Sequence, residues 1–287
     1  MARVEHYAVL GVARNASQDD VRTAKTEDAP FITVYHFSDD DLKRDLYVGR
    51  IGGFERQWSE RAWTLIDTFV KEFPAGLKEF ESLLVRNRIF MDRTIKAGPV
   101  SAEMALDYGF TGPNLRACGV DYDVRVMNPY SSYQDFEFVI PIGTQGDVYD
   151  RFMVRSEEMW QSISIINQAI SKIDRKQGEF HGNVPEFYLP EKADVYNNME
   201  ALIYHFKIVM GESDVPKGEV YHAVEGANGE LGFYLISDGG RTPYRLHFRR
   251  PCFIYYQAYP EIIKGGMLSD AILTMASMNV IAGELDA

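Results

Sequence analysis

The sequence predicts an α+β fold: a mainly helical bundle with a small antiparallel β-meander lobe. Two observations carry this prediction. In several segments between residue 59 and about residue 210, apolar residues recur at three- and four-residue spacing, which is typical of the buried face of a helix. Residues 217–256 instead alternate in polarity around glycine turns, which is typical of antiparallel strands. A helical region followed by a strand region predicts segregated layers rather than alternating βα units.

The length of 287 residues suits two domains, or one large domain with an added lobe. We expect an atypical amino-terminal segment of unknown role over residues 1–45 and one domain over residues 46–287. Within that domain we expect a mainly helical part (46–215), the β-meander (216–260), and a carboxyl-terminal helix and tail (261–287).

Composition limits the classes of function. Lys and Arg number 30 against 42 Asp and Glu, giving a net charge of −12. Nucleic acid is therefore not expected as a partner, because phosphate contacts need clustered cations. Two cysteines, Cys118 and Cys252, are too few for a disulfide framework or a structural zinc site. The isolated cysteines fit a reducing compartment. The sequence shows neither a secretory signal nor an apolar run long enough to span a membrane, and docking onto a membrane complex stays open.

The first helices are predicted from caps and breakers. Ser59 is the expected N-cap of a helix that ends at Pro74, and a second helix is expected over residues 77–94. Ser101 is positioned to cap a short helix that reaches about Tyr108.

Residues 109–147 are rich in turn residues, with a short strand expected over residues 135–142. Asp147 is the expected N-cap of the longest helix, over residues 148–173. Residues 178–190 are expected to be a linker before a helix over residues 195–210. The residues expected to face inward on that helix are Met199, Leu202, Ile203, Phe206 and Met210.

The meander is predicted as three strands, over residues 220–224, 231–236 and 244–248. Asn228-Gly229 is a tight-turn signal between the first two strands, and Gly239-Gly240 lies in the second turn. A terminal helix is expected from about Ser269.

Two polar clusters are candidates for chemistry, since phosphate-binding loops, metal-ligand spacings and nucleophile motifs are missing from the sequence. One cluster lies in the turn-rich region and is interpreted either as a steering site for a charged ligand or proton, or as an ion-pair network that fixes an irregular loop. It consists of Arg116, Asp121, Asp123 and Arg125. The other is a basic stripe that either binds a partner or faces solvent. It consists of Tyr244, Arg245, His247, Arg249 and Arg250, with Arg245, His247 and Arg249 on one sheet face.

From about Tyr47 onward, well-separated motifs resemble the D subunit of bacterial NADH–quinone oxidoreductase, respiratory complex I, a family related to nickel–iron hydrogenase large subunits. The motifs are Arg50-Ile-Gly-Gly53, the 110–119 segment FTGPNLRACG, the 146–151 segment GDVYDR, the 199–207 segment MEALIYHFK, the 216–221 segment PKGEVY, the 237–240 segment SDGG, and the 283–286 segment GELD. The resemblance covers over four fifths of the chain.

The resemblance implies a hydrogenase large-subunit-like bundle with a small β-lobe. It implies a subunit that helps to form a quinone-reduction site beside a [4Fe–4S] cluster held by a partner subunit, with NAD(H) and FMN bound elsewhere in the complex. Electron transfer from NADH to quinone would be coupled to proton translocation. The implied partners are the other complex I subunits, especially the cluster-bearing neighbour and the membrane arm, and quinone itself. The implied place is peripheral, on the cytoplasmic side of the inner membrane or the equivalent matrix side.

The residues carried over as quinone- or cluster-facing candidates are Arg50, Gly52, Gly53, Asp270, Val280, Glu284 and Asp286. Structural roles are the alternative: Gly52-Gly53 as a turn, Arg50 as an ion-pair anchor and the tail as packing. Neither cysteine has a second cysteine three residues away, so the paired thiolates that hold nickel and iron in hydrogenases are missing.

The family's His and Tyr that bond the quinone carbonyls are not found, so the catalytic residues stay unassigned and activity of the isolated chain is not expected. The alternative function is a truncated, non-catalytic remnant or assembly protein that keeps only the docking surface.

Overall fold

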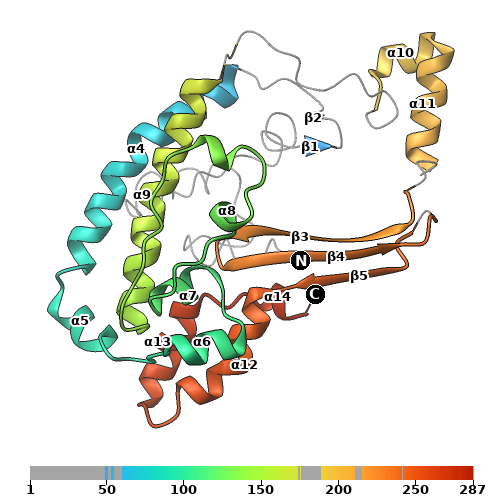
Figure 1. Ribbon diagram of the computed structural model, residues 1–287. Coiled ribbons are helices and arrows are strands. Elements are labelled where there is room, and N and C mark those ends of the chain that lie inside the picture. The colour runs from blue at the N-terminus through green and yellow to red at the C-terminus, as the bar shows by residue number, and fades with distance from the viewer. Residues whose placement is uncertain are drawn as a thin grey trace, which may run out of the picture. The chain divides into compact units, whose positions relative to one another are not determined.

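The computed structural model describes residues 49–50, 53–54, 60–173, 175, 189–210, 215–240 and 242–286, and it has the predicted α+β fold (Figure 1). The chain forms two compact units, one of residues 1–48 and 56–80 and the other of residues 49–55 and 81–287. The expected segment 1–45 lies outside the described residues. The predicted division of residues 46–287 stays a prediction.

The first long helix, α4 (Glu60–Leu84), is continuous through Pro74, so the predicted end at this proline is wrong. Proline fixes φ near the helical value and removes one backbone donor, so a long helix with good flanking turns can absorb it at a cost of about 3 kcal/mol. The chain turns instead after Leu84, and α5 (Arg88–Thr94) begins where the Asn87 side chain accepts hydrogen bonds from two backbone amides. The expected cap Ser59 lies outside the described residues.

The expected short helix is confirmed as α6 (Ala102–Tyr108). The Ser101 side chain accepts a hydrogen bond from the Met104 amide, and Gly109 ends the helix with a positive φ of 78°. The next helices, α7 (Gly112–Ala117) and α8 (Val124–Met127), fall in the turn-rich region and are too short to be predicted by periodicity.

The strand expected over residues 135–142 is wrong. A 3₁₀ turn, η2 (Tyr133–Asp135), leads into an extended segment without strand pairing in the described structure. Two of its backbone amides donate hydrogen bonds to side chains instead: the Glu137 amide to Gln168 at 2.9 Å and the Val139 amide to Gln161 at 3.0 Å. Both glutamines lie on α9 (Val148–Lys172), the predicted longest helix, and its predicted N-cap Asp147 accepts from the Asp150 amide at 2.9 Å.

The predicted helix 195–210 is divided into α10 (Lys192–Asn197) and α11 (Met199–Met210) at the extended residue Asn198. The prediction that its apolar residues face inward is wrong. In the described structure five of them are 47–77% exposed: Met199, Leu202, Ile203, Phe206 and Met210. Most of the expected linker 178–190 lies outside the described residues.

The meander is confirmed as a sheet with strand order β3 (Gly218–Gly226), β4 (Gly229–Ser237) and β5 (Arg245–Arg249), all antiparallel. The turn between β3 and β4 contains Asn228 as predicted. Pairing places Leu235 between Val220 and Leu246, and Phe233 between His222 and Phe248, so one sheet face is mainly apolar. The opposite face carries Tyr221, Tyr234 and His247 in register.

The chain then returns to helix in α12 (Pro251–Ile262), α13 (Leu268–Met278) and α14 (Ala282–Asp286). Residues 251–260 were expected in the meander. They are helical, and α12 contacts α6, α13 and β4, as Figure 1 shows.

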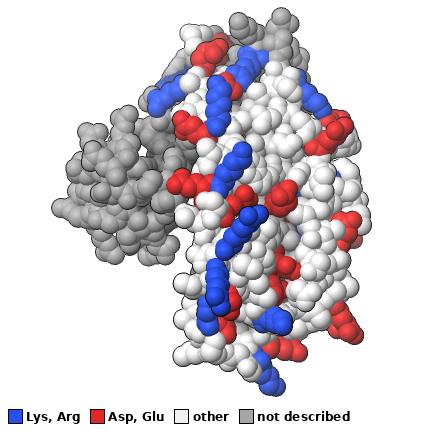
Figure 2. Space-filling view, turned by 90° about the vertical axis from the view of Figure 1, so that its left-hand side faces the viewer, with Lys and Arg blue, Asp and Glu red and all other residues white. Residues whose placement is uncertain are grey.

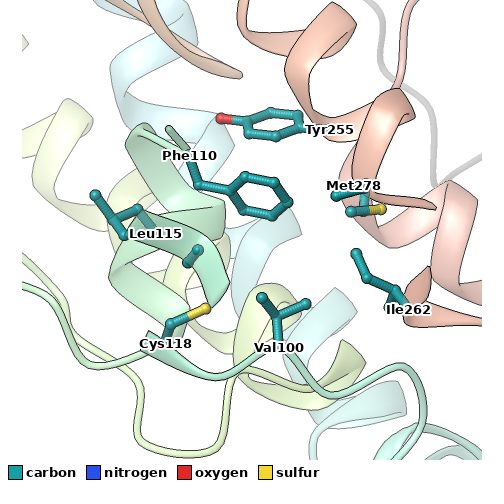
Figure 3. Close-up of a cluster of buried hydrophobic side chains, with 9 residues drawn as sticks. Val100, Phe110, Leu115, Cys118, Tyr255, Ile262 and Met278 are labelled. Carbon is teal, nitrogen blue, oxygen red and sulfur yellow. The ribbon is translucent and has the colours of Figure 1, made fainter. Parts of the chain in front are cut away.

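The main core lies where α12 faces α6, α7 and α13 (Figure 3). The rings of Phe110 and Tyr255 meet edge to face with centroids 4.8 Å apart, a geometry that adds about 0.5–1.5 kcal/mol beyond burial. The cluster is completed by Val100, Ala105, Leu115, Cys118, Ala258, Ile262 and Met278. This core fixes α7 and the last turn of α13 against each other.

On the face that Figure 2 displays, Lys and Arg side chains are interspersed with Asp and Glu. The net charge of −12 is therefore not gathered into one acidic block on that face.

Candidate functional site

The Arg50-Ile-Gly-Gly53 motif forms a minimal hairpin. β1 (Gly49–Arg50) pairs antiparallel with β2 (Gly53–Phe54), with Arg50 opposite Gly53. Gly52 lies outside the described residues.

Asp270 lies in the first turn of α13, where a carboxylate complements the helix dipole. Its Oδ1 accepts from the Arg93 guanidinium at 2.5 Å, and the same guanidinium donates to Ser269 Oγ at 2.8 Å. Asp270 therefore ties α13 to α5 in the described structure.

The terminal candidates Val280, Glu284 and Asp286 follow Asn279, which ends α13 in the left-handed conformation with φ of 55°. Glu284 accepts from the Cys252 backbone amide at 3.0 Å, so its carboxylate sits at the start of α12. Val280 packs at the edge of the main core, and Asp286 is exposed.

A buried polar group holds the end of α13. Asn114 on α7 donates to the Met278 carbonyl at 3.2 Å and accepts from Arg155 on α9 at 3.0 Å. Arg151, one helical turn before Arg155, donates to Ser277 Oγ at 2.9 Å and to two loop carbonyls. The Arg155 Nε is enclosed and has no hydrogen-bond partner among the described residues.

These two arginines carry charge into the interior. Burial lowers the pKa of Arg151 to about 10 and also lowers the pKa of Arg155. Neither forms an ion pair with a carboxylate in the described part of the chain. The end of α13 therefore lies beside two buried guanidinium groups.

The cluster predicted around Arg116 is an ion-pair network. Arg116 is 1% exposed and lies 3.4 Å from Asp123, 2.6 Å from Glu158 and 2.8 Å from Glu225. Asp123 also pairs with Arg125 at 2.6 Å and caps α8. The interpretation as a network that fixes an irregular loop is confirmed, whereas Asp121 is exposed and outside it.

Sequence reasoning missed Glu158 and Glu225 because α9 and β3 are distant in the chain. One signal was present: Arg151, Arg155 and Glu158 recur at four- and three-residue spacing, so they share a face of α9. Burial raises the pKa of Glu158 and of Glu225, and Arg116 opposes this shift in both.

A neighbouring group joins the sheet to residues on either side of α7. Glu230 accepts from Tyr122 at 2.9 Å and from Tyr221 at 2.6 Å, and burial followed by this hydrogen bonding raises the pKa of each phenol to about 12. Arg249 donates to the Glu230 carbonyl at 2.8 Å and to the Gly109 carbonyl at 2.9 Å.

The residues of the basic stripe do not all have the same role. Register confirms that Arg245, His247 and Arg249 share a face. Arg249 donates hydrogen bonds to two backbone carbonyls within the fold, whereas Arg245 and His247 are exposed. Tyr244 is also exposed, and Arg250 lies over the Phe253 ring at 5.3 Å.

Among the described residues, His, Cys, Asp and Glu form no group of three or more that is placed to hold a metal ion. Cys118 and Cys252 are both buried free thiols. A search of the described helices finds none whose length and apolarity would suffice to span a membrane.

Comparison with known proteins supplies the family. The model described as "Respiratory-chain NADH dehydrogenase, 49 Kd subunit" matches residues 45–287. The second D subunit of NADH-quinone oxidoreductase from Cytophaga hutchinsonii is 70% identical over 241 residues, which cover 84% of this chain and 61% of that protein. The D subunit of the Flavobacterium psychrophilum enzyme is 68% identical over 240 residues, covering 84% of this chain and 58% of the relative.

A combined form is also similar: the C/D subunit of NADH-quinone oxidoreductase from Bdellovibrio bacteriovorus is 48% identical over 237 residues, covering 83% of this chain and 42% of that protein. The chain thus spans 61% and 58% of the length of the two relatives above. Because the family model matches far more than half of the residues, the chain belongs to the family of the respiratory-chain NADH dehydrogenase 49 kDa subunit.

Proposed function

We propose that the chain is a subunit of an NADH–quinone oxidoreductase and helps to form the site where quinone is reduced. The observation that carries this proposal is the family match over residues 45–287, together with relatives up to 70% identical that are named as the D subunit of that enzyme. The chain would bind no redox cofactor by itself. Electrons would reach quinone from a [4Fe–4S] cluster on a partner subunit, with NAD(H) and FMN elsewhere in the complex.

The proposed quinone- or cluster-facing residues remain Arg50, Gly52, Gly53, Asp270, Val280, Glu284 and Asp286. Two of them make contacts within the chain that stabilise the fold: Asp270 pairs with Arg93, and Glu284 accepts a hydrogen bond from the Cys252 amide at the start of α12. Arg151 and Arg155 support a site near the end of α13, because buried positive charge stabilises a group that becomes anionic on reduction.

The proposed partners are the cluster-bearing neighbour and the membrane arm, with the chain peripheral on the cytoplasmic side of the inner membrane. Such a position requires protein contacts rather than a span, and the family of the relatives supports it.

Deletion of the gene and complementation test the function. Membranes from the deletion strain should lose NADH-driven quinone reduction, while NADH oxidation by a water-soluble artificial acceptor, which needs only the flavin site, should persist. Re-expression of the chain should restore the quinone reaction. Unchanged quinone turnover in a deletion strain would contradict the proposal, and a chain that still co-purified with the complex would then be a docking remnant or assembly protein.

A further inference from the structure

We propose that residues Val280–Asp286 form a latch over the buried Cys252, closed by the Glu284 carboxylate at the first turn of α12. This inference does not depend on the proposed quinone site. It assigns to the terminal segment two states, one closed as in the structure and one in which the segment swings away about Asn279.

The closing contact replaces a cap that α12 lacks. The N-cap residue Arg250 provides no side-chain hydrogen bond to the first turn in the described structure, and Pro251 has no amide to donate. The Cys252 amide is therefore an unsatisfied donor unless another segment supplies an acceptor. Glu284 supplies it at 3.0 Å, from 32 residues further along the chain, and its charge complements the positive end of the helix dipole.

Apart from Glu284, the segment is held by Val280, which packs at the edge of the main core, and by the contact between α14 and α12. Among its described residues α14 has no buried side chain, Ile281 is 48% exposed, and a Cβ added at Gly283 would meet open space. Segments with so few buried apolar contacts open at low free-energy cost. The end of α13 before the segment is anchored firmly: Met278 has no exposed area, and its carbonyl accepts from Asn114.

The pivot lies between the anchored and the weakly held parts. Asn279 adopts the left-handed conformation, its side chain bonds Asn228, and its carbonyl lies 3.5 Å from the Cys252 sulfur. A rotation beyond this residue moves Glu284 away from α12 without disturbing α13. The opening therefore removes the part of the cover over Cys252 that the segment supplies, and it lifts Val280 from the edge of the main core while the buried members of that core stay in place.

Cys252 reports which state is present. Its side chain has no exposed area, and burial followed by hydrogen bonding to Glu284 raises its pKa to about 11. A thiol that is both covered and protonated reacts slowly with alkylating reagents. Its labelling rate at neutral pH therefore measures the fraction of chains in the open state.

The test uses the full 287-residue chain with Cys118→Ser, so that Cys252 is the single thiol. Glu284→Ala should speed the labelling of Cys252 by about fivefold, the effect of losing a cap worth about 1 kcal/mol. Asp286→Ala, a matched truncation of an exposed carboxylate in the same helix, should leave the rate within about twofold.

A second reporter separates opening of the latch from general loosening. In a Cys252→Ser background, the labelling of Cys118, which lies in the main core, should not respond to Glu284→Ala. Equal acceleration at both cysteines would overturn the latch, because it would indicate global destabilisation. Cys252 labelling that was unchanged by Glu284→Ala, or equally raised by Asp286→Ala, would overturn it as well.

Discussion

Arg116 neutralises three carboxylates that come from two helices and a strand. Asp123, Glu158 and Glu225 all lie within 3.4 Å of its guanidinium, in a site that water barely reaches. Replacing the arginine by Met keeps much of its volume but leaves buried negative charges that lack their main partner. We expect Arg116→Met to lower the free energy of unfolding by about 3–5 kcal/mol, as for other broken buried pairs.

Denaturant titration followed by circular dichroism measures this loss. Arg88→Met is the matched control, because Arg88 pairs with Asp92 at 3.7 Å while both side chains are largely exposed. Such pairs contribute about 0.3–0.5 kcal/mol. Similar losses in the two variants would show that the Arg116 network is not a main support of the fold.

Glu158 gives the network a pH dependence with a definite sign. Burial raises its pKa, so the folded chain binds a proton at this carboxyl more tightly than the unfolded chain does. The stabilisation from that proton is complete below the ordinary glutamate pKa of about 4.3 and is lost as the pH rises through the raised value. The stability of the native chain relative to Glu158→Gln should therefore be greater at pH 5 than at pH 8.

Urea titrations at the two pH values provide the measurement, and Glu157→Gln is the control, since Glu157 is the exposed neighbour on the same helix. The relative stability of the control should not change with pH in this way. An advantage over Glu158→Gln that grew from pH 5 to pH 8 would show that the ion pair with Arg116 outweighs burial.

At the scale of single residues, sequence reasoning found part of the network. Arg116, Asp123 and Arg125 lie within ten residues of each other, so their proximity is visible in the sequence. Glu225 lies 109 residues from Arg116, and its approach depends on how β3 meets α8. Partners brought together only by tertiary packing leave no local pattern to read.

At the scale of elements, the start of α7 depends on glycine for two separate reasons. Gly112 has a φ of +62°, and a Cβ added there would come within 2.3 Å of the Gly229 backbone. Gly109, which ends α6, also has a positive φ of 78°, but a Cβ there meets nothing within 4 Å. An alanine at either position would have a strained left-handed backbone, but only at position 112 would its Cβ also collide with a neighbouring backbone.

This pair predicts unequal effects of the same substitution. Gly109→Ala should cost about 1–2 kcal/mol, the usual penalty for a left-handed alanine. Gly112→Ala should cost at least about 2 kcal/mol more, about the loss from a poorly accommodated core group, because the α7–β4 contact must separate. Unfolding midpoints of the two variants measure the difference, and equal midpoints would mean that the backbones move apart freely.

The elements that sequence reasoning placed correctly are those with local signals. Ser101 and Asp147 each accept a hydrogen bond from an amide three residues ahead, and the Asn228 turn fixes the register of β3 and β4. The failures arise where tertiary contacts decide. Two backbone amides of the extended segment after η2 donate hydrogen bonds to glutamine side chains of α9 instead of pairing with a strand. The aromatic segment of α12 is helical because it packs against α6 and α13.

At the scale of the whole molecule, large apolar side chains of the described chain are exposed both on α11 and on one face of the sheet. Val220 is 55% exposed, Leu246 45%, Phe248 37% and Phe233 36%, and register places all four on one face. Contiguous exposed apolar area of this kind marks a surface that associates with another protein or with itself. The proposed assembly with other subunits would cover such a face.

We therefore expect the isolated chain to self-associate through this face. Leu246→Thr keeps a strand-forming residue while removing apolar area, so it should reduce self-association, measured by light scattering, and change the free energy of unfolding by less than about 1 kcal/mol. Tyr244→Thr is the control: Tyr244 is 73% exposed but precedes β5, so its loss should leave self-association unchanged.

If Leu246→Thr lowered the free energy of unfolding by more than about 2 kcal/mol, the prediction would be contradicted, because a side chain that is open to solvent contributes little to folding. Equal scattering from Leu246→Thr and the native chain would place the associating surface elsewhere.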